Sequence, residues 1–290
     1  MSETGAIAVD PDSMAHKRDA FLARIGLGAL IMGIVNVTPD SFSDGGKFET
    51  AAAAVAQARR LAQEGAAIID VGAESTRPGH EPVPAEVERA RLEPLLGAIV
   101  ASVAEPVSID TSKASVARFA TGQGVAFIND VWGLQRDPAM ADVVAESGAG
   151  VVIMHNRGEL DPECDIVDDM RRFFDKSLML AEKAGVPRQR IILDPGVGFG
   201  KTRQQNLQAI HGMRALLTYE LPILLGVSRK SLLRSLVPDA PVSAAQVEPR
   251  LVATIAANLA GAAAGAAIFR VHDVADHVAA FKVFDAIERA

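Results

Sequence analysis

Short apolar runs recur along the chain, and each is followed by a stretch in which apolar residues have helical spacing. The runs are continuously apolar rather than alternating, which is typical of parallel strands buried on both faces. The predicted strands are Leu30–Val37, Ala67–Gly72, Pro106–Asp110, Ala126–Val131, Gly150–His155, Arg190–Asp194, Pro222–Val227 and Ala266–Val271. The predicted helices are Thr50–Glu64, Ala85–Ala101, Ser112–Gln123, Ala139–Ser147, Ile166–Ala184, Gln204–Tyr219, Glu248–Ala264 and Val274–Glu288.

Eight strand–helix units in 290 residues predict an α/β protein built as a single (β/α)8 TIM barrel. An open, doubly wound sheet is the alternative architecture for the same alternation. No Pro- or Ser-rich linker divides the chain, so we expect one barrel domain over residues 29–290. Residues 1–28 lack the apolar core of a signal peptide. We expect them to form an N-terminal extension that is partly disordered.

Composition narrows the classes of partner. Apolar residues make up 49% of the chain, enough for a sizeable core. A net charge of −7 argues against nucleic acid or an anionic membrane as a partner. Leu251–Phe269 is uncharged and long enough to cross a bilayer, but its Ala and Gly content favours a packed helix followed by a strand. Cys164 is the only cysteine, which excludes an internal disulfide and suits a reducing cytosol.

The predicted strands run from an apolar body into polar or ionisable tips. A single tip residue is as readily a helix cap or a solvated loop residue as a functional one. In a barrel, however, the carboxyl ends of all strands meet at one mouth, where active sites form. The tip residues are Asn36, Asp70, Asp110, Asn129, His155, Asp194, Arg229, Lys230, Arg270 and His272. Their convergence predicts a functional site.

These tip residues divide by chemistry. Asp110, Asn129 and Asp194 offer hydrogen-bond acceptors and donors for a flat, polar heterocycle. The basic groups follow the last two strands, where barrels often hold phosphate. Among them, Arg270 has the planar fork that suits phosphate oxygens. We expect Arg229 to point outward and to pair with a surface carboxylate instead.

Two further signals bear on cofactors. The stretch "DPGVGFGKT" has Pro195 where a phosphate-binding loop requires its first Gly, so it predicts a tight turn that holds Phe199 over the pocket. No His or Cys spacing indicates zinc. Magnesium bound mainly by substrate phosphates and water needs only one protein oxygen, so such a site leaves little trace in a sequence.

Eight segments together resemble the dihydropteroate synthase family, in that family's order from about residue 29 to the C-terminus. They are "IMGIVNVTPDSFSDGG", "IIDVGAESTRPG", "SIDTSK", "INDVWG", "MH", "ILDPGVGFGK", "GVSRKS" and "FRVHDV". Members of this family are TIM barrels that join para-aminobenzoate to dihydropterin pyrophosphate and release pyrophosphate. The resemblance implies the same fold and the same transferase activity here.

The resemblance also implies a role for particular residues. The pterin ligands it implies are Asp110, Asn129, Met154, Asp194, Gly226 and Lys230. Asn36 is the implied ligand of Mg2+, and the implied pyrophosphate ligands are Asn36, Arg270 and His272. The residues implied for the para-aminobenzoate pocket are Thr76, Arg77, Pro78, Phe199 and Ser231. Phe42 and Asp44 are expected on a mobile lid, and the expected catalytic residues are Asn36, Asp44, Lys230, Arg270 and His272.

The family further implies a dissociative reaction, a cytoplasmic homodimer and a sulfonamide target, although sequence alone does not settle susceptibility. The Ala- and Gly-rich helix around residues 254–264 suits either the dimer contact or packing within its own barrel. Asp70 is interpreted as a residue that orients the loop after the second strand, and His155 is left without a role. Ala73, Val197 and residues 156–169 depart from the family pattern, but none of them is an implied ligand.

Two other functions share this barrel and pterin pocket. One is a pterin-binding protein without catalysis, which predicts the loss of lid or pyrophosphate residues, yet all of them are present. The other is a methyltransferase that uses methyltetrahydrofolate, which has no use for the "STRPG" segment or a pyrophosphate site.

Overall fold

A computed structural model describes residues 11–37, 47–74, 82–237 and 248–290. Within them, the strands are β1 (Leu30–Asn36), β2 (Ile68–Gly72), β3 (Val107–Asp110), β4 (Phe127–Asp130), β5 (Gly150–Met154), β6 (Ile191–Asp194), β7 (Leu224–Leu225) and β8 (Ile268–Val271). The helices are α1 (Pro11–Leu22), α2 (Lys47–Gln63), α3 (Ala85–Leu92), α4 (Leu96–Ser102), α5 (Ala114–Gly122), α6 (Met140–Ser147), α7 (Ile166–Ala184), α8 (Arg203–His211), α9 (Ser231–Leu236), α10 (Pro249–Ala263) and α11 (Val274–Glu288). Two 3-10 helices are η2 (Arg188–Arg190) and η3 (Gly212–Tyr219).

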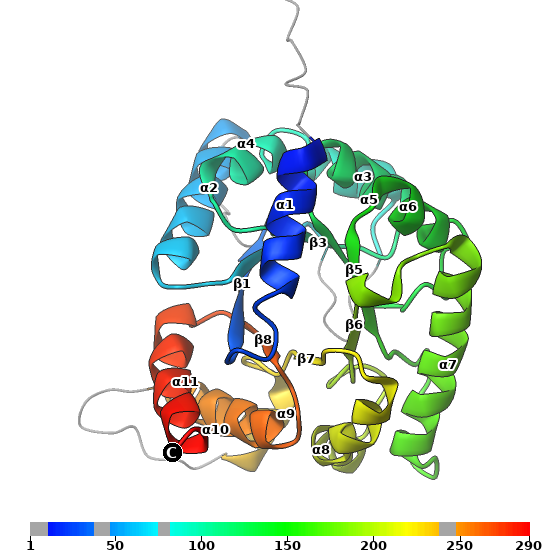
Figure 1. Cartoon of the computed structure of the whole chain (residues 1–290), viewed down its shortest axis with the longest axis vertical. Helices are drawn as coiled ribbons and strands as arrows, with labels where there is room; N and C mark the ends of the chain where they lie inside the picture. The colour runs from blue at the N-terminus through cyan, green and yellow to red at the C-terminus, as the bar shows by residue number, and fades with distance from the viewer. Residues whose placement is uncertain (1–10, 38–46, 75–81, 238–247) are drawn as a thin grey trace, which may run out of the picture.

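The strands form one parallel sheet that curls into a barrel, with the helices around it (Figure 1). The strand order is β6-β5-β4-β3-β2-β1-β8-β7. A bridge between Leu193 and Ile223 joins the two ends of this order, and the Leu193 amide donates to the Pro222 carbonyl at 2.9 Å. The predicted (β/α)8 barrel is therefore confirmed, and the open sheet is excluded.

Alternate residues of the strands face the barrel interior, and their chemistry changes along the strand. Near the amino ends they form an apolar cluster, in which Ile68, Phe127, Ile192 and Ile268 are each at most 1% exposed. Two residues further along the same strands come Asp70, Asn129, Asp194 and Arg270. Because strand side chains repeat with a period of two, these polar residues face the same interior. The barrel is thus apolar at its amino end and polar at its carboxyl end.

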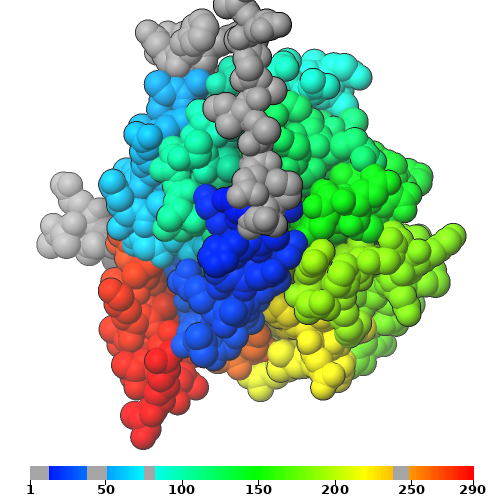
Figure 2. All heavy atoms as spheres, turned by 45° about the horizontal axis from the view of Figure 1, so that its top comes forward, coloured from blue at the N-terminus to red at the C-terminus, as the bar shows by residue number. Residues whose placement is uncertain are grey.

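Helix α1 lies across the barrel and packs on its amino end (Figures 1 and 2). Its buried residues Met14, Arg18 and Phe21 have the spacing of one helical face. Phe21 meets Phe127 of β4 edge to face, with ring centroids 5.2 Å apart. The part of the expected N-terminal extension that the structure describes thus contains a helix, one face of which covers the amino end of the barrel. Residues 1–10 lie outside the described residues.

Three helical segments differ from the predicted ones. The helix expected over 85–101 is divided into α3 and α4, because Pro94 lies between them and has no N–H to donate. The helix expected over 204–219 is α8 followed by η3. The short α9 follows β7 directly and was not predicted. Its few residues carry too little apolar periodicity to be recognised.

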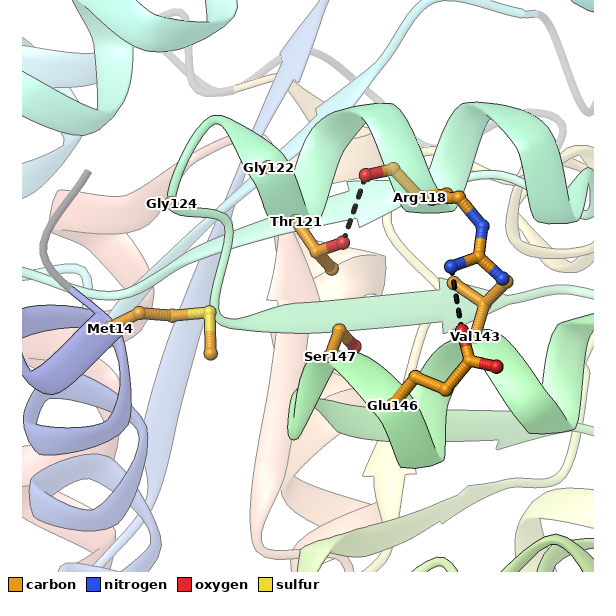
Figure 3. A pocket seen from close by; sticks show the side chains of 8 residues that line it. All are labelled: Met14, Arg118, Thr121, Gly122, Gly124, Val143, Glu146 and Ser147. Atoms are coloured by element: carbon orange, nitrogen blue, oxygen red, sulfur yellow. Dashed lines mark hydrogen bonds and ion pairs between the residues drawn. The ribbon is translucent and has the colours of Figure 1, made fainter. Parts of the chain in front are cut away.

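A surface hollow of about 340 Å³ lies at the amino end of the barrel, between α1, α5 and α6 (Figure 3). Gly124 and Ser147, which precede β4 and β5, line it with Met14. The exposed side chains of Arg118 and Glu146 pair across it at 2.6 Å. The hollow is therefore at the end of the barrel opposite the polar strand tips.

Candidate active site

The centre of the polar end is Arg270, on β8. Its Nε donates to Asp70 Oδ2 at 2.6 Å, and its Nη2 donates to Asp110 Oδ2 at 2.9 Å. Asn129 Nδ2 donates to the same Asp70 oxygen at 3.2 Å. Side chains from β2, β3, β4 and β8 are thereby joined into one network. Arg270 is 20% exposed and its two carboxylate partners are buried, so the cation lies at the mouth above them.

The buried carboxylates of this network are only partly satisfied. Oδ1 of Asp70, Asp110 and Asn129 has no hydrogen-bond partner among the described residues. Burial raises the pKa of Asp110, and the Arg270 guanidinium opposes this rise. Buried acceptors normally have partners. These oxygens are therefore available to accept hydrogen bonds from water or from a ligand.

A second charged group lies at the ends of β6 and β7. Asp194 is buried, and its Oδ1 accepts a hydrogen bond from the Gly196 amide at 2.7 Å. Burial raises the pKa of Asp194, while the Lys230 ammonium opposes the rise. Burial lowers the pKa of Lys230 to about 8, and Asp194 opposes this fall. Lys230 Nζ also donates to the Val197 carbonyl and lies 4.6 Å from the centre of the Phe199 ring.

Two glycines, Gly72 and Gly226, lie next to the charged side chains at this end of the barrel. A Cβ at Gly226 would lie 3.8 Å from Asp194 Oδ2 and 3.9 Å from Arg270 Cβ. A Cβ at Gly72 would lie 3.8 Å both from Asn36 Oδ1 and from Asp110 Oδ2. The glycines therefore place Asn36 beside Asp110, and Arg270 beside Asp194. We call Asn36, Asp70, Asp110, Asn129, Asp194, Lys230 and Arg270, with the two glycines, the polar ring.

The other residues implied by the resemblance lie on β5, on α9 and in the loops after β7 and β8, or outside the described residues. Met154 pairs in register with Asp194 and is buried. Ser228 Oγ lies 2.9 Å from His272 Nδ1, in the neighbouring loops. Ser231 is the exposed first residue of α9. Thr76, Arg77, Pro78, Phe42 and Asp44 lie outside the described residues.

Two other tip residues, Arg229 and Asp70, and one residue outside the tip set, Lys201, also lie near this end of the barrel. Arg229 does point outward, where it forms a two-point pair with Asp273. Asp70 was interpreted as a loop-orienting residue, but it is a fully buried partner of Arg270. Its position two residues after Ile68 is the signal that identifies it as inward-facing. The sequence gives no signal for Lys201, which is buried beneath the loop after β6.

His155 does not belong to the polar ring. Its Nε2 lies 3.2 Å from Asp169 Oδ2 on α7, and its ring meets the Phe173 ring edge to face. The side chain is fully buried between β5 and α7. Burial lowers the pKa of His155 to about 3, helped by Lys201 and opposed by Asp169. The native ring is therefore neutral, and its role is in packing.

This lowered pKa predicts acid sensitivity. Below pH 6.5 the unfolded chain protonates His155, whereas the native protein does not until about pH 3. Stability should therefore fall as the pH falls through this window, by about 1.4 kcal/mol per pH unit, or about 2 kcal/mol at pH 5. Urea unfolding of wild type and His155→Gln at pH 7 and pH 5 measures this loss as the difference between the two proteins. Asp110 and Asp194 have the opposite pH dependence but are present in both. Equal pH dependence of the two proteins would contradict the assignment.

Comparison with known proteins agrees with this architecture. The family described as pterin binding enzyme matches residues 32–272. A dihydropteroate synthase from Clostridium beijerinckii is 44% identical over 266 residues, covering 91% of this chain and 96% of that protein. A Xanthomonas albilineans dihydropteroate synthase structure with 4-aminobenzoic acid has a TM-score of 0.84 at 42% identity, covering 91% of this chain and 94% of that one. The same enzyme in complex with 7,8-dihydropteroate has a TM-score of 0.78 at 37% identity, with the same coverage.

The fold is thus a (β/α)8 barrel with a polar carboxyl end, and the relatives that it matches define the protein as a transferase. The chain belongs to the dihydropteroate synthase family of pterin binding enzymes. Among the described residues, no helix is both long enough and apolar enough to span a membrane.

Proposed function

We propose that the polar ring binds 6-hydroxymethyl-7,8-dihydropterin pyrophosphate and that the enzyme joins it to para-aminobenzoate, giving 7,8-dihydropteroate and pyrophosphate. The observation that carries this proposal is the set of buried acceptors without partners, on Asp110, Asn129 and Asp70, beside a row of cations. A pterin is flat and carries several N–H donors, while its pyrophosphate is anionic. The unpaired acceptors of the polar ring suit the N–H donors of the pterin, and its cations suit the pyrophosphate.

The proposed pterin site lies between the two charged groups. Asp110 and Asn129 accept from the heterocycle on one side, and Asp194 and Lys230 bind it on the other. Gly226 leaves the space in which the flat ring fits, and buried Met154 packs beneath it. Because these groups lie on different strands, the barrel holds them in place before substrate arrives.

We assign the pyrophosphate to Arg270, His272 and Asn36. The described residues contain no group of three or more His, Cys, Asp or Glu side chains that could hold a metal ion. Asn36 offers one amide oxygen, partly exposed at the mouth. This donor set fits Mg2+ that takes its other ligands from phosphate and water. When bound, Mg2+ neutralises charge on the departing pyrophosphate.

Loss of the Asn36 oxygen should weaken metal binding selectively. We expect Asn36→Ala to raise the Mg2+ concentration for half-maximal rate by about tenfold, since the loss of one supporting group typically costs at least this much in metal affinity. Binding of the pterin without its pyrophosphate, measured by calorimetry without metal, should be unchanged. An unaltered Mg2+ dependence would remove Asn36 from the metal site.

Para-aminobenzoate is assigned to the open side of the polar ring, against Phe199 and Ser231. The sequence adds Thr76, Arg77 and Pro78 to this pocket, and Phe42 and Asp44 to a lid. These assignments rest on the resemblance to the family, because the five residues lie outside the described residues.

We expect Asp44→Ala to reduce turnover far more than it weakens pterin binding. Measurements of kcat and of the pterin Kd for wild type and the variant test this expectation.

The proposed chemistry is dissociative. The bond between the pterin methylene and the pyrophosphate oxygen breaks first, and its electrons leave with pyrophosphate. The aryl amine then forms the new C–N bond and loses a proton. Arg270 and His272 stabilise the negative charge that develops on the leaving group. The carboxylates of Asp110 and Asp194 favour the cationic pterin methylene electrostatically, and the amine needs no dedicated general base.

A coupled assay for pyrophosphate tests this proposal. Pyrophosphate should accumulate at full rate only when the pterin pyrophosphate, para-aminobenzoate and Mg2+ are all present. Tight pterin binding without turnover would instead support the non-catalytic pterin-binding protein. Methyl transfer from methyltetrahydrofolate would support the methyltransferase.

We further propose a cytosolic homodimer that is inhibited by sulfonamides, which resemble para-aminobenzoate. Of the two interpretations of the small residues of α10, packing within its own barrel is supported at Gly261, where a Cβ would lie 2.3 Å from Leu225 Cδ2. Exposed Val252 on α10 and Val283 and Ile287 on α11 offer a better contact. Analytical ultracentrifugation should show a dimer for wild type and a larger fraction of monomer for Val283→Glu at the same concentration. A monomeric wild type would contradict this part of the proposal.

A further inference from the structure

Lys201 is a buried cation whose role is not accounted for by the polar ring. Its side chain lies beneath the loop of residues 195–202, which we call the β6 loop, and the residue is 7% exposed. Nζ donates to the carbonyls of Gly196 at 2.7 Å, Phe199 at 3.1 Å and His155 at 3.4 Å. An ammonium group has three N–H donors, so all three are used on backbone carbonyls. Two of these belong to the β6 loop and the third follows β5.

Burial of the Lys201 ammonium group is unfavourable for its charged form. Burial lowers the pKa of Lys201 to about 7, while Asp194 opposes the fall. No carboxylate of the described residues lies within ion-pair distance of its Nζ. A buried charge is costly unless polar groups surround it. Here the backbone carbonyls serve that purpose, so the β6 loop and Lys201 depend on each other.

The β6 loop is packed directly on the backbone that follows β5. A Cβ at Gly196 would lie 1.8 Å from the His155 carbonyl oxygen, and one at Gly200 would lie 2.5 Å from the Arg157 carbonyl oxygen. Both glycines have a positive φ, of 64° and 58°. Only glycine permits this approach. Lys201 therefore ties together two loops that are already in backbone contact.

The same β6 loop carries the aromatic ring assigned to para-aminobenzoate. Phe199 lies between Gly198 and Gly200, two residues with positive φ that impose little restraint of their own. Asn206 holds the turn from α8, since its Oδ1 accepts from the Gly198 amide and its Nδ2 donates to the Lys201 carbonyl at 3.2 Å. Phe199 itself is held by two hydrogen bonds: its amide donates to the Gly196 carbonyl at 3.2 Å, and its carbonyl accepts from Lys201 Nζ at 3.1 Å. Because Lys201 Nζ also binds the Gly196 carbonyl, it contacts both ends of this turn.

We propose that Lys201 is a positioning residue for the second substrate: its carbonyl contacts fix the β6 loop so that Phe199 lies beside Lys230, against the bound para-aminobenzoate. This inference rests on the proposed function and goes further, because it assigns part of para-aminobenzoate recognition to a side chain that does not touch the substrate. Pterin recognition depends on it less, because Asp110, Asn129 and Arg270 lie on other strands. Asp194 and Lys230 each make one contact to the β6 loop, at Gly196 and Val197, but Asp194 belongs to β6 itself and Lys230 follows β7.

Lys201→Met tests this role, with Arg203→Met as the control. Arg203 is an exposed cation two residues away, at the start of α8. We expect Lys201→Met to raise KM for para-aminobenzoate tenfold or more, while the Kd for dihydropterin pyrophosphate changes less than threefold. Arg203→Met should leave both constants at the wild-type values. Lys201→Gln, whose amide keeps two N–H donors, should give an intermediate KM and is the test variant if Lys201→Met does not fold.

Chemical rescue separates positioning from a general loss of structure. In Lys201→Ala, ethylammonium should lower KM for para-aminobenzoate toward the wild-type value, because it can occupy the space left by the side chain. An unchanged KM in the Met and Gln variants would overturn the inference, as would an equal rise in KM and in pterin Kd without amine rescue. Wild-type product formation is measured first. Its absence contradicts the proposed function, whereas a normal wild type with normal variants contradicts only the role of Lys201.

Discussion

Replacing Arg270 with methionine is expected to lower kcat/KM for dihydropterin pyrophosphate by about a hundredfold to a thousandfold. Arg270 is the cation at the centre of the polar ring, 2.6 Å from Asp70 and 2.9 Å from Asp110. In the proposed reaction it also faces the charge that develops on pyrophosphate. Loss of one such preorganised donor typically costs about 3–4 kcal/mol of transition-state stabilisation, and every 1.4 kcal/mol is a factor of about ten in rate. Initial rates at saturating para-aminobenzoate measure this.

The same substitution should also destabilise the fold. It leaves Asp70 and Asp110 as buried carboxylates without their cation, which typically costs about 3–5 kcal/mol. Arg229→Met is the matched control, since that arginine forms its pair with Asp273 at the surface and should cost less than about 1 kcal/mol. Arg270→Lys keeps the charge without the planar fork and should be intermediate in both rate and stability. A folded Arg270→Met enzyme with wild-type kcat/KM would remove Arg270 from catalysis.

Lys230→Met should have the second largest effect, on the binding of the pterin. Lys230 is the cation that most strongly opposes the rise in the pKa of Asp194, and it donates to the Val197 carbonyl in the loop that carries Phe199. Without it, the pKa of Asp194 should rise further, because burial raises this pKa and the Lys230 ammonium opposes the rise. The charged form of Asp194 then becomes less favourable. Both changes remove charged contacts to the heterocycle, each of the kind that contributes about 1.5–3 kcal/mol. We expect the Kd for dihydropterin pyrophosphate to rise about a hundredfold, as measured by calorimetry.

The control for this variant is Lys176→Met, on the exposed surface of α7. It removes the same charge and side chain without touching the polar ring, so its Kd should equal that of wild type. If Lys230→Met bound the pterin as tightly as this control, Lys230 would have no part in the pterin site.

The sequence was sufficient for the barrel because buried parallel strands leave continuous apolar runs. It also located Asp110, Asn129, Asp194, Lys230 and Arg270 at the strand ends. The sequence did not predict which of these side chains contact each other. The pairing of Arg270 with Asp70 joins residues 200 positions apart and depends on strand register. Each strand's spacing of two identifies an inward-facing position, but not which neighbour it meets.

Other features depended on tertiary structure in ways that local patterns do not report. Over residues 13–22 of helix α1, three positions on one face are buried, which is too weak a pattern to predict that the helix packs on the barrel. In the sequence "GFGK", nothing distinguishes Lys201 from an exposed loop lysine. Its burial follows from backbone packing at Gly196 and Gly200. The hydrogen bonds that define its role are to carbonyl groups, which every residue possesses. Side-chain identity alone therefore gives no signal.

The central claim is that the polar ring joins two substrates rather than merely binding a pterin. A quantitative product analysis tests it most directly: enzyme, Mg2+, dihydropterin pyrophosphate and isotopically labelled para-aminobenzoate are mixed, and both products are measured by mass spectrometry and a pyrophosphate assay. We expect labelled 7,8-dihydropteroate and pyrophosphate to form in equal amounts. Pyrophosphate without labelled dihydropteroate, or neither product despite bound pterin, would contradict the claim.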